Sequence, residues 1–223
     1  MPTKLFVFAT PKEAKAFWQT HIDFVQGQPV QVKDQTWSLV TGISLLNAVF
    51  LSAVLQKIKV DLVINLGIAG AFDLDQFNLG SIVICKQEIW PELGVWTEQG
   101  VENELLNFNL FRNKELCLTN QLTLEPQKIL DQFGLKFNYP LVKSISVAGV
   151  SGTWQQRSLL AQRYKPDIEN MEGFGLAYVC KLFKISFLEI RTISNLVGSR
   201  KQKDWDIPLA LNQLQLVAAK FNL

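Results

Sequence analysis

Short apolar runs alternate along the chain with longer segments in which apolar residues recur every three or four positions. The short runs are rich in Val, Ile and Phe and predict strands at 5–9, 37–40, 61–66, 81–85, 144–148 and 186–193. The longer segments predict helices at 11–19, 43–58, 126–133, 154–164, 171–183 and 206–220. Alternation of this kind is typical of an α/β domain in which helices cover a largely parallel sheet.

The pattern continues without an internal repeat, a low-complexity tract or a linker, and 223 residues suffice to bury a sizeable core. We therefore expect one domain over residues 1–223. The least regular segment is 89–125, which includes an apolar but aperiodic run at 105–111. A long irregular segment of this kind is typical of an active-site loop or of an insertion that faces a partner.

Charged residues are few, and this argues against some classes of function. Charged residues make up 19% of the chain, against about 25% in an average soluble domain, and the net charge is only +2. Lys and Arg are scattered, so we expect neither a nucleic acid nor an anionic membrane as a partner. The apolar run near the first residue is too short for a signal peptide, and no run approaches the roughly 20 residues that span a bilayer.

The three cysteines, Cys85, Cys117 and Cys180, lie far apart and lack the spacing of a disulfide framework or of a metal site. This usage fits a reducing cytoplasm. The single histidine, His21, is expected at the surface near a helix end, and we expect no zinc site.

Ligands in open α/β sheets bind beyond the carboxyl ends of the strands, so the residues after each predicted strand are the candidates for chemistry. In FATPKEAKAF, Thr10 can cap the following helix, Pro11 fits its first position, and Glu13 completes a capping box. Glu13 is then either only a cap or a carboxylate at the functional edge of the sheet. In VINLGIAGAF, the small residues 67–70 either admit a ligand to the backbone or form a tight turn after the strand.

Two further segments carry charged groups in apolar surroundings. In DIENMEGFGLAYVC, Asn170 can cap a helix, and the helix dipole favours Glu172 in its first turn by about 0.3–1 kcal/mol. Gly173 beside it costs helix stability, which close packing or a ligand would explain. In FLEIRTISN, a period of two places Glu189 and Arg191 on one face of a strand. The two residues form a structural ion pair, or Arg191 orients an acid at a site.

Five sequence motifs, in this order, resemble those of the nucleoside phosphorylase and hydrolase family, which includes methylthioadenosine/S-adenosylhomocysteine nucleosidase. They are ATPKEA, TGISLLNA, VINLGIAGAF, IENMEGFGLAYVC, and EIRTISN with WDIPLAL after it, and they are spread over residues 9–211. Within that family they are most similar to the futalosine hydrolase branch. The resemblance implies a central twisted mixed sheet, partly barrel-like and surrounded by helices, and a homodimer. It also implies cleavage of a purine N-glycosidic bond, with no cofactor and no metal.

The resemblance assigns the tasks of such a cleavage to particular residues. The transition state resembles a ribosyl oxocarbenium ion, which needs an acceptor for a proton of water, groups on the ribose hydroxyls and donors on the departing base. Glu13 matches the acid that activates water, with Arg191 beside that water or acid. Glu172, which follows Met171, matches the carboxylate that grips the hydroxyls and stabilises the developing cation.

Residues at the base are assigned in the same way. Asn195, after Ser194, stands where adenine-cleaving relatives have Asp. An amide donates to O6 of a 6-oxopurine and accepts from a protonated N7, which favours hypoxanthine or guanine over adenine; otherwise Asn195 is an inert residue at a strand end. Trp205 matches an aromatic residue of the 5′ pocket, and Trp154 is a candidate to stack on the base or a core residue.

Ile68, Ala69 and Gly70 would line the sugar and water side, and Ile68 stands where adenine-specific relatives carry Ser. The second substrate is water or phosphate. Family phosphorylases hold phosphate with several arginines, mostly from the amino-terminal half, whereas the first arginine of this chain is Arg112. Water is therefore favoured.

Futalosine carries an aryl carboxylate at its 5′ end, and Arg200, Lys201 or Lys203 could meet it, or all three belong to a basic surface loop. The resemblance thus predicts a cytoplasmic enzyme that hydrolyses futalosine to hypoxanthine and dehypoxanthine futalosine, a step of menaquinone biosynthesis. The alternatives are a nucleosidase or phosphorylase for inosine or methylthioadenosine/S-adenosylhomocysteine, and a nucleoside-binding protein without turnover. Retention of both Glu13 and Glu172 argues against the last of these.

Overall fold

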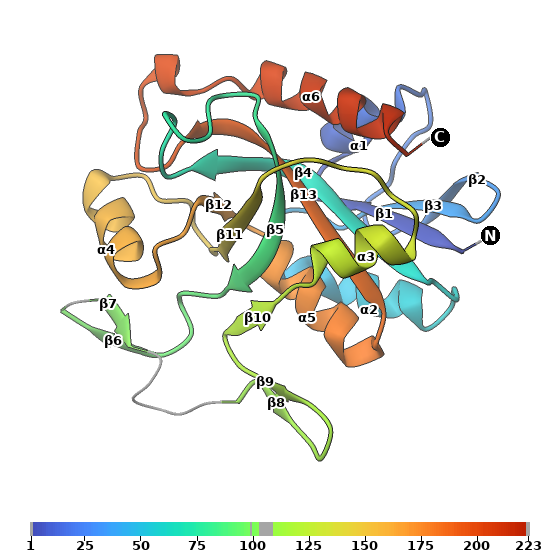
Figure 1. Cartoon of the computed structure of the whole chain (residues 1–223), viewed down its shortest axis with the longest axis horizontal. Helices are drawn as coiled ribbons and strands as arrows, with labels where there is room; N and C mark the ends of the chain where they lie inside the picture. Colours follow the sequence, from blue (N-terminus) through green and yellow to red (C-terminus); the bar gives the residue numbers. More distant parts are fainter. Residues whose placement is uncertain (1, 99, 103–108, 222–223) are drawn as a thin grey trace.

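The computed structural model of the chain describes residues 2–98, 100–102 and 109–221 (Figure 1). Its central feature is a sheet that has nine strands in the described residues: β1 Lys4–Phe8, β2 Val30–Lys33, β3 Thr36–Val40, β4 Leu62–Ala71, β5 Ile82–Ile89, β10 Gln121–Thr123, β11 Leu141–Ser146, β12 Ile168–Asn170 and β13 Ser186–Leu196. The strand order is β10, β5, β11, β12, β4, β1, β3, β2, and β13 pairs with both β4 and β5.

The pairing of β13 closes part of the sheet into a ring. β4 is parallel to β13, and β13 is antiparallel to β5. β5 is parallel to β11 and β11 to β12, and β12 returns antiparallel to β4. β1, β3 and β2 continue the sheet beyond the ring. The sheet is therefore mixed and partly barrel-like, as the resemblance implied, and less parallel than the alternation of elements alone predicted.

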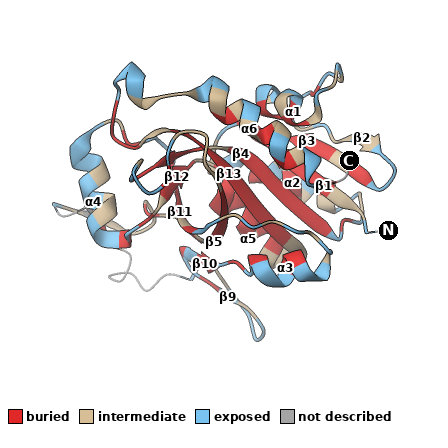
Figure 2. Cartoon of the chain, turned by 45° about the horizontal axis from the view of Figure 1, so that its top comes forward, coloured by how far each residue is buried: buried red, intermediate tan, exposed pale blue. Residues whose placement is uncertain are grey.

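Helices cover both faces of the sheet, and Figure 2 shows buried strands between helices whose outer sides are exposed. The helices are α1 Pro11–Trp18, α2 Ala48–Leu55, α3 Pro126–Gln132, α4 Trp154–Tyr164, α5 Gly173–Phe183 and α6 Ile207–Ala219, with 3₁₀ turns η1 Leu45–Asn47 and η2 Gln202–Asp204. α1 and α6 pack together on one face, and α2 and α5 pack together on the other.

The side chains of β1 show how the core is divided between these layers. Phe6 and Phe8 pack with residues of α1 and α6, whereas Leu5 and Val7 pack with residues of α2 and α5. Successive residues of a strand point to opposite faces, so both faces of β1 are buried. This explains why the strand reads as an uninterrupted apolar run.

Each predicted helix occurs, 154–164 with the predicted ends and the others with shifted ends, but several strands differ from the prediction. The predicted strand 61–66 continues to Ala71, so residues 67–70 belong to β4 and form no turn. The predicted helix 43–58 is divided into η1 and α2 and ends at Leu55. β2, β10 and β12 were not predicted because each has only three or four residues, polar ones among them.

The irregular segment 89–125 forms two small hairpins that project from the sheet (Figure 1). They are β6 Val95–Thr97 with β7 Gly100–Glu102, and β8 Phe111–Arg112 with β9 Cys117–Leu118. The chain then rejoins the sheet as β10. Residues 105–108 of the aperiodic run lie outside the described residues.

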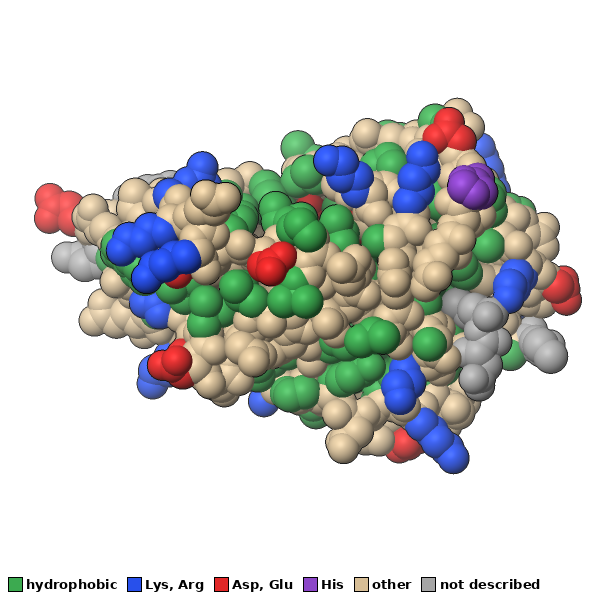
Figure 3. Space-filling model, turned by 90° about the horizontal axis from the view of Figure 1, so that it is seen from above, with side chains coloured by type: hydrophobic (Ala, Val, Ile, Leu, Met, Phe, Trp, Pro, Cys, Tyr) green, Lys and Arg blue, Asp and Glu red, His purple; other side chains and the backbone are tan. Residues whose placement is uncertain are grey.

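The surface agrees with the scattered charge of the sequence. On the face shown in Figure 3, Lys and Arg side chains lie in separate groups and do not merge into one basic surface. His21 is exposed just beyond the end of α1. Across the described part of the chain, every helix is too short or too polar to cross a membrane.

Candidate active site

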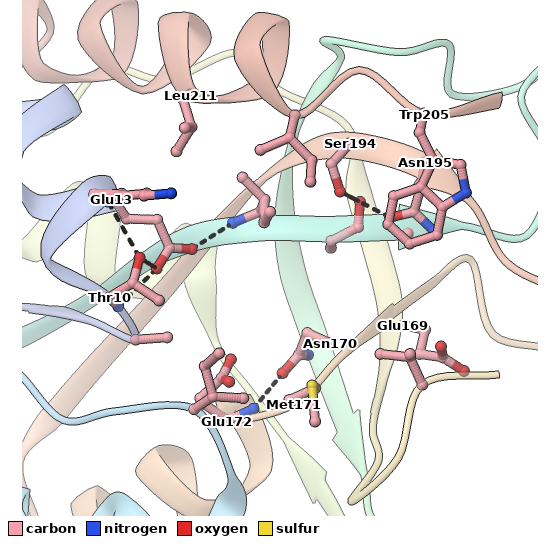
Figure 4. Close-up of a pocket in the computed structure, with 18 residues that line it drawn as sticks. Thr10, Glu13, Glu169, Asn170, Met171, Glu172, Ser194, Asn195, Trp205 and Leu211 are labelled. Atoms are coloured by element: carbon pink, nitrogen blue, oxygen red, sulfur yellow. Dashed lines mark hydrogen bonds between the residues drawn. The ribbon is translucent and has the colours of Figure 1, made fainter. Parts of the chain in front are cut away.

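A cavity of about 320 Å³ opens at the carboxyl ends of β1, β4 and β13, and residues of α1, α6 and β12 complete its wall (Figure 4). This is the position at which open α/β sheets bind ligands. The predicted site residues that line it are Glu13, Ile68, Ala69, Gly70, Met171, Glu172, Ser194, Asn195 and Trp205. Segments from both ends of the sequence therefore meet around one cavity.

Glu13 is both a helix cap and a wall of the cavity. The backbone N–H and the hydroxyl of Thr10 donate to Glu13 Oε2 at 2.9 and 2.8 Å, and the backbone N–H of Glu13 donates to Thr10 Oγ1 at 3.3 Å. The backbone N–H of Ile68 donates to Glu13 Oε1 at 3.1 Å. The capping box is thus confirmed, and it holds the carboxylate at the cavity, so the two alternatives for Glu13 are compatible.

The glycines of β4 are explained by side chains that cross the strand. A Cβ on Gly67 would lie 2.6 Å from Arg191 Nη1 and 2.8 Å from Glu13 Oε1, and a Cβ on Gly70 would lie 2.8 Å from Asn195 Nδ2. Any larger residue would displace these groups. The alternative of a tight turn at 67–70 is wrong, because β4 continues through these residues and stays paired with β13, with one register shift between Ile193 and Asn195.

Glu172 lies immediately before α5, one position earlier than the first turn predicted from the sequence. Asn170 was expected to be the cap and instead ends β12, although its Oδ1 still accepts from the backbone N–H groups of Glu172 and Gly173 at 2.9 and 2.8 Å. The carboxylate of Glu172 accepts from the backbone N–H of Ser44 at 3.3 Å. Glu172 is therefore fixed by groups from two separate segments.

The two acids lie close enough to affect each other electrostatically. Glu13 and Glu172 are 4% and 6% exposed. Burial raises the pKa of Glu172 to about 7, the Arg191 guanidinium opposes this rise, and the charge of Glu13 adds to it. Near neutral pH the cavity thus contains a carboxyl group that is poised between its two protonation states.

Arg191 does not line the cavity but supports it from behind. The side chain is fully buried, and its Nε donates to Glu189 Oε1 at 2.9 Å. Its Nη1 lies 3.7 Å from Glu172 Oε2, and its Nη2 donates to Asn65 Oδ1. The two alternatives for Arg191 are compatible, because it forms a structural ion pair with Glu189 and also lies against an acid of the cavity. That acid is Glu172, whereas the resemblance placed Arg191 beside Glu13 or its water.

Asn195 and Trp205 lie at the end of the cavity away from Glu13 (Figure 4). The hydroxyl of Ser194 donates to Asn195 Oδ1 at 2.8 Å. This bond orients the amide so that Nδ2 remains able to donate to a ligand. The indole N–H of Trp205 donates to the carbonyl of Ser199 at 2.9 Å, which fixes the ring at the rim.

Besides Arg191, four predicted residues lie outside the cavity lining. Trp154 does not line the cavity and is not a core residue, because the amino-terminal end of α4 turns its ring outward, where it is 50% exposed with Arg157 5.3 Å from its centroid. Geometry therefore gives no support to stacking of Trp154 on a base. Arg200, Lys201 and Lys203 are also absent from the lining, and Arg200 lies 6.0 Å from the Trp205 ring.

Two lining residues with charged side chains were missed, Lys12 and Glu169. Lys12 is one of several lysines at exposed positions, and its sequence context does not distinguish it from the others. Glu169 belongs to β12, which the pattern did not predict. Its carboxylate accepts from the backbone N–H and the hydroxyl of Ser151 at 2.8 and 2.5 Å, and burial raises its pKa.

A cluster with metal-ligand types is present in the described residues, but its contacts do not suit a metal. The ligand atoms of Cys85, Glu88 and Glu189 lie within 4.8 Å of one another, all fully buried. The Arg191 guanidinium already occupies Glu189 Oε1 at 2.9 Å, so a second cation there would meet its charge.

Fold and cavity together define an α/β protein that presents two opposed carboxylates and an oriented amide to one small ligand. The chain belongs to the phosphorylase superfamily, whose family profile matches residues 8–222. This match covers nearly the whole chain and includes every residue of the cavity wall.

Individual members of the superfamily to which the chain is similar are as follows. The chain is 29% identical over 180 residues to futalosine hydrolase of Thermus thermophilus, a match that covers 79% of this chain and 76% of the relative. It is 31% identical over 157 residues to futalosine hydrolase of Acidothermus cellulolyticus, covering 69% and 61%. It is also 29% identical over 143 residues to a 5′-methylthioadenosine/S-adenosylhomocysteine nucleosidase of Buchnera aphidicola, covering 63% and 54%.

Solved structures confirm the predicted fold. A futalosine hydrolase mutant of Helicobacter pylori superposes with a TM-score of 0.73 at 14% identity, covering 100% of this chain and 97% of that one. The Neisseria meningitidis 5′-methylthioadenosine/S-adenosylhomocysteine nucleosidase in complex with methylthio-immucillin-A gives 0.74 at 15% identity and covers 99% of each chain.

Proposed function

We propose that this protein is a nucleoside hydrolase that cleaves the N-glycosidic bond of futalosine and releases hypoxanthine and dehypoxanthine futalosine. The observation that carries the proposal is the placement of Glu13, Glu172 and Asn195 around one cavity at the carboxyl ends of the strands. The named futalosine hydrolases among its relatives support the choice of substrate.

Glu13 is the general base in this proposal. Its carboxylate is held by Thr10 and Ile68 and borders the cavity, so a water between it and the anomeric carbon can transfer a proton to it as the base departs. Ile68 offers no hydroxyl to this water, in contrast to the Ser of adenine-specific relatives. Its backbone N–H is used to fix Glu13 instead.

Glu172 binds the ribose in this proposal. An ionised carboxylate accepts hydrogen bonds from the ribose hydroxyls, and its negative charge stabilises the oxocarbenium-like transition state. Arg191 lies on the far side of Glu172 at 3.7 Å, where it favours the ionised form without contacting the sugar. Met171 lines the cavity beside it.

Asn195 recognises the base. With Oδ1 held by the Ser194 hydroxyl, Nδ2 is available to O6 of a 6-oxopurine, and the second lone pair of Oδ1 is available to a protonated N7. An adenine would instead present an amino group to Nδ2, which leaves two donors facing each other. The amide thus supports hypoxanthine over adenine.

Water rather than phosphate is the second substrate in this proposal. Lys12 is the only Lys or Arg among the lining residues that the structure describes, and the same lining contains the carboxyl groups of Glu13, Glu169 and Glu172. Phosphate dianions are typically held by several cationic side chains, and one lysine beside three carboxyl groups does not provide them. Within the same proposal we infer a homodimer in the cytoplasm, from the family resemblance and from the cysteine usage.

The test is product identification with purified protein. Futalosine, inosine and methylthioadenosine are each incubated with and without phosphate, and the free base and the sugar product are separated by chromatography. The proposal expects hypoxanthine from futalosine at a rate that phosphate does not change. Formation of a ribose 1-phosphate derivative, or faster release of adenine from methylthioadenosine, would overturn it in favour of the alternative family activities.

A further inference from the structure

The outer part of the cavity differs chemically from its floor. The floor carries three buried carboxyl groups, those of Glu13, Glu169 and Glu172. The mouth carries apolar side chains, among which Ile43 and Ile207 are 53% and 42% exposed. A ligand that fills the whole cavity therefore meets polar groups inside and an apolar surface at the entrance.

Lys12 is the cation of this mouth. It lies in the first turn of α1, is exposed, and lines the cavity. In the described residues no carboxylate lies within ion-pair distance of its ammonium group. Lys15 on the same helix is paired with Asp23 at 3.7 Å instead. Lys12 thus presents to the cavity a positive charge that has no ion-pair partner among the described residues.

The direction of a bound nucleoside decides what Lys12 meets. Glu13 and Leu211 lie at one end of the cavity, and Asn195 and Trp205 lie at the other (Figure 4). If the base binds at Asn195 and the ribose between the two acids, the 5′ substituent extends past Glu13 toward Leu211 and the mouth. Trp205, which the resemblance matched to the 5′ pocket, then lies beside the base instead. The predicted cations Arg200, Lys201 and Lys203 are absent from this lining.

We infer that Lys12, with the apolar mouth formed by Ile43 and Leu211, is a subsite for an anionic group on an apolar 5′ substituent of the nucleoside. This inference rests on the proposed function, because it requires a nucleoside in the cavity. An anion is excluded from the floor by the buried carboxyl groups, and only the mouth offers it an opposite charge. The matching ligand class is a 5′-aryl or 5′-alkyl carboxylate.

The test compares two nucleosides that differ only in the charge of the 5′ end, an aryl carboxylate and its methyl ester, each made with hypoxanthine and with adenine as base. The measured quantity is the ratio of kcat/KM for the acid to kcat/KM for the ester. We expect Lys12→Met to lower this ratio about three- to fivefold and Lys12→Glu to lower it about tenfold or more. Lys15→Met is the matched control, a lysine of the same helix outside the cavity, and should keep the wild-type ratio.

An acid-to-ester ratio that stays within about 1.5-fold of wild type in both Lys12 variants would overturn the subsite. Failure of the proposed function is a separate result. If the wild-type protein releases adenine from the adenine pair and no hypoxanthine from the other pair, the assigned substrate is wrong, and the effect of Lys12 is still measured on the adenine pair.

A second observation lies behind the cavity, beneath the start of α5. Glu88 of β5 and Glu189 of β13 are fully buried side by side. A Cβ on Gly173 would lie 2.6 Å from Glu88 Oε1 and 2.8 Å from Glu189 Oε2, so the first residue of α5 rests on both carboxyl groups. Glycine at this position is thus explained by close packing.

The two acids differ in how many of their oxygens accept a hydrogen bond. Glu88 accepts from Asn170 Nδ2 and from the Ser146 hydroxyl, each at 2.7 Å. Glu189 Oε1 accepts from Arg191 Nε at 2.9 Å, whereas Glu189 Oε2 is buried and has no hydrogen-bond partner in the described residues. An unpaired buried oxygen beside a second buried acid is satisfied if the pair retains a proton.

The geometry points to one proton shared by Glu88 and Glu189, which makes them positioning residues that hold Asn170 and Arg191, and through these Glu172. Asn170 binds Glu88 and also accepts from the backbone N–H of Glu172. Arg191 binds Glu189 and lies 3.7 Å from Glu172. If the pair holds one proton, it carries a single negative charge. The positive charge of Arg191 then balances Glu189 and still attracts the carboxylate of Glu172. Burial and the neighbouring charge of Glu189 also raise the pKa of Glu88 well above its usual range.

If Glu88 keeps the proton and Glu189 is ionised, replacing each of them by Gln should affect the enzyme differently. Glu88→Gln replaces a protonated acid by a neutral group of the same shape, and we expect kcat/KM to stay within about threefold of wild type. Glu189→Gln removes the counter-charge of Arg191. The charged groups that face Glu172 are then Arg191 and Glu13, with the backbone N–H of Ser44. Loss of the negative charge of Glu189 lowers the pKa of Glu172, so the acidic side of the kcat/KM profile shifts to lower pH.

The pH dependence of kcat/KM therefore distinguishes a positioning role of the Glu88–Glu189 pair from a role in packing alone. A pair that only fills space would give no shift in either variant, and a fully ionised pair would give the same downward shift in both; each result overturns the shared proton. Thermal melting reports whether Glu189→Gln folds. If it does not, infrared difference spectra between wild type and Glu88→Gln at about pH 8 decide instead, because a retained proton gives a carboxylic acid band that the variant lacks.

Discussion

The substitution Asn195→Asp tests how the cavity recognises the base. It keeps the size of the side chain and the oxygen that accepts from the Ser194 hydroxyl at 2.8 Å, so the orientation of the group is preserved. It replaces the donor Nδ2 by a second acceptor. At the proposed site a hypoxanthine O6 then faces a carboxylate oxygen, while the amino group of adenine gains an acceptor.

The size of the effect follows from the cost of one mismatched polar contact in a buried site, about 1–3 kcal/mol. Since about 1.4 kcal/mol corresponds to a factor of ten, this predicts a change of about 5- to 150-fold in the preference between the two bases. Asn195 is partly buried at the inner wall of the cavity, next to Gly70, so solvent replaces the lost contact only in part.

The assay is a competition between two nucleosides with the same 5′ substituent, one with hypoxanthine and one with adenine, in which both free bases are measured over time. Ser194→Ala is the control, because it removes the bond that orients the amide without adding an acceptor. We expect it to slow both reactions with a smaller change of ratio. A ratio of adenine to hypoxanthine release within about twofold of wild type for Asn195→Asp would refute the role of this residue in base recognition.

Three further outcomes are expected. Because the pKa of Glu172 is about 7 and the ionised form binds the ribose hydroxyls, kcat/KM should fall as the pH drops below about 7, and a flat profile between about pH 5 and 8 would contradict this assignment. Gly67→Ala should lower kcat about tenfold or more in a folded protein, since its Cβ would displace Arg191 and Glu13, and near-normal turnover would show that their placement is unimportant. Trp154→Ala should change kcat/KM less than about twofold because the ring lies outside the cavity; a large loss would return Trp154 to the site.

Much of the fold was predictable because its central elements are buried on both sides or strongly amphipathic. β1 reads as an apolar run, and α1 begins with a capping box, and both occur where expected. Closure of the sheet into a partial barrel was not predictable from periodicity, because it depends on long-range pairing of β13 with both β4 and β5. Only the family resemblance indicated it.

The candidate site also has residues that the sequence predicted and residues that it did not. Glu13 and Glu172 were found because each is a carboxylate at a predicted helix start, and the family resemblance assigned their roles. Glu169 was missed because it belongs to a strand of three residues that is defined by its neighbours and not by its own sequence. Lys12 was missed because only the cavity distinguishes it from other exposed lysines, whereas Trp154 was overestimated because its exposure depends on the orientation of α4.

The central claim is that the Glu13 carboxylate accepts the proton of the water that attacks the sugar in the cavity it shares with Glu172. Single-turnover release of hypoxanthine from futalosine by Glu13→Gln, with the dissociation constant measured alongside, tests this claim most directly. We expect Glu13→Gln to release hypoxanthine at least about 100-fold more slowly than wild type, with a dissociation constant within about fivefold of the wild-type value. Release within about threefold of wild type at an unchanged dissociation constant would contradict it.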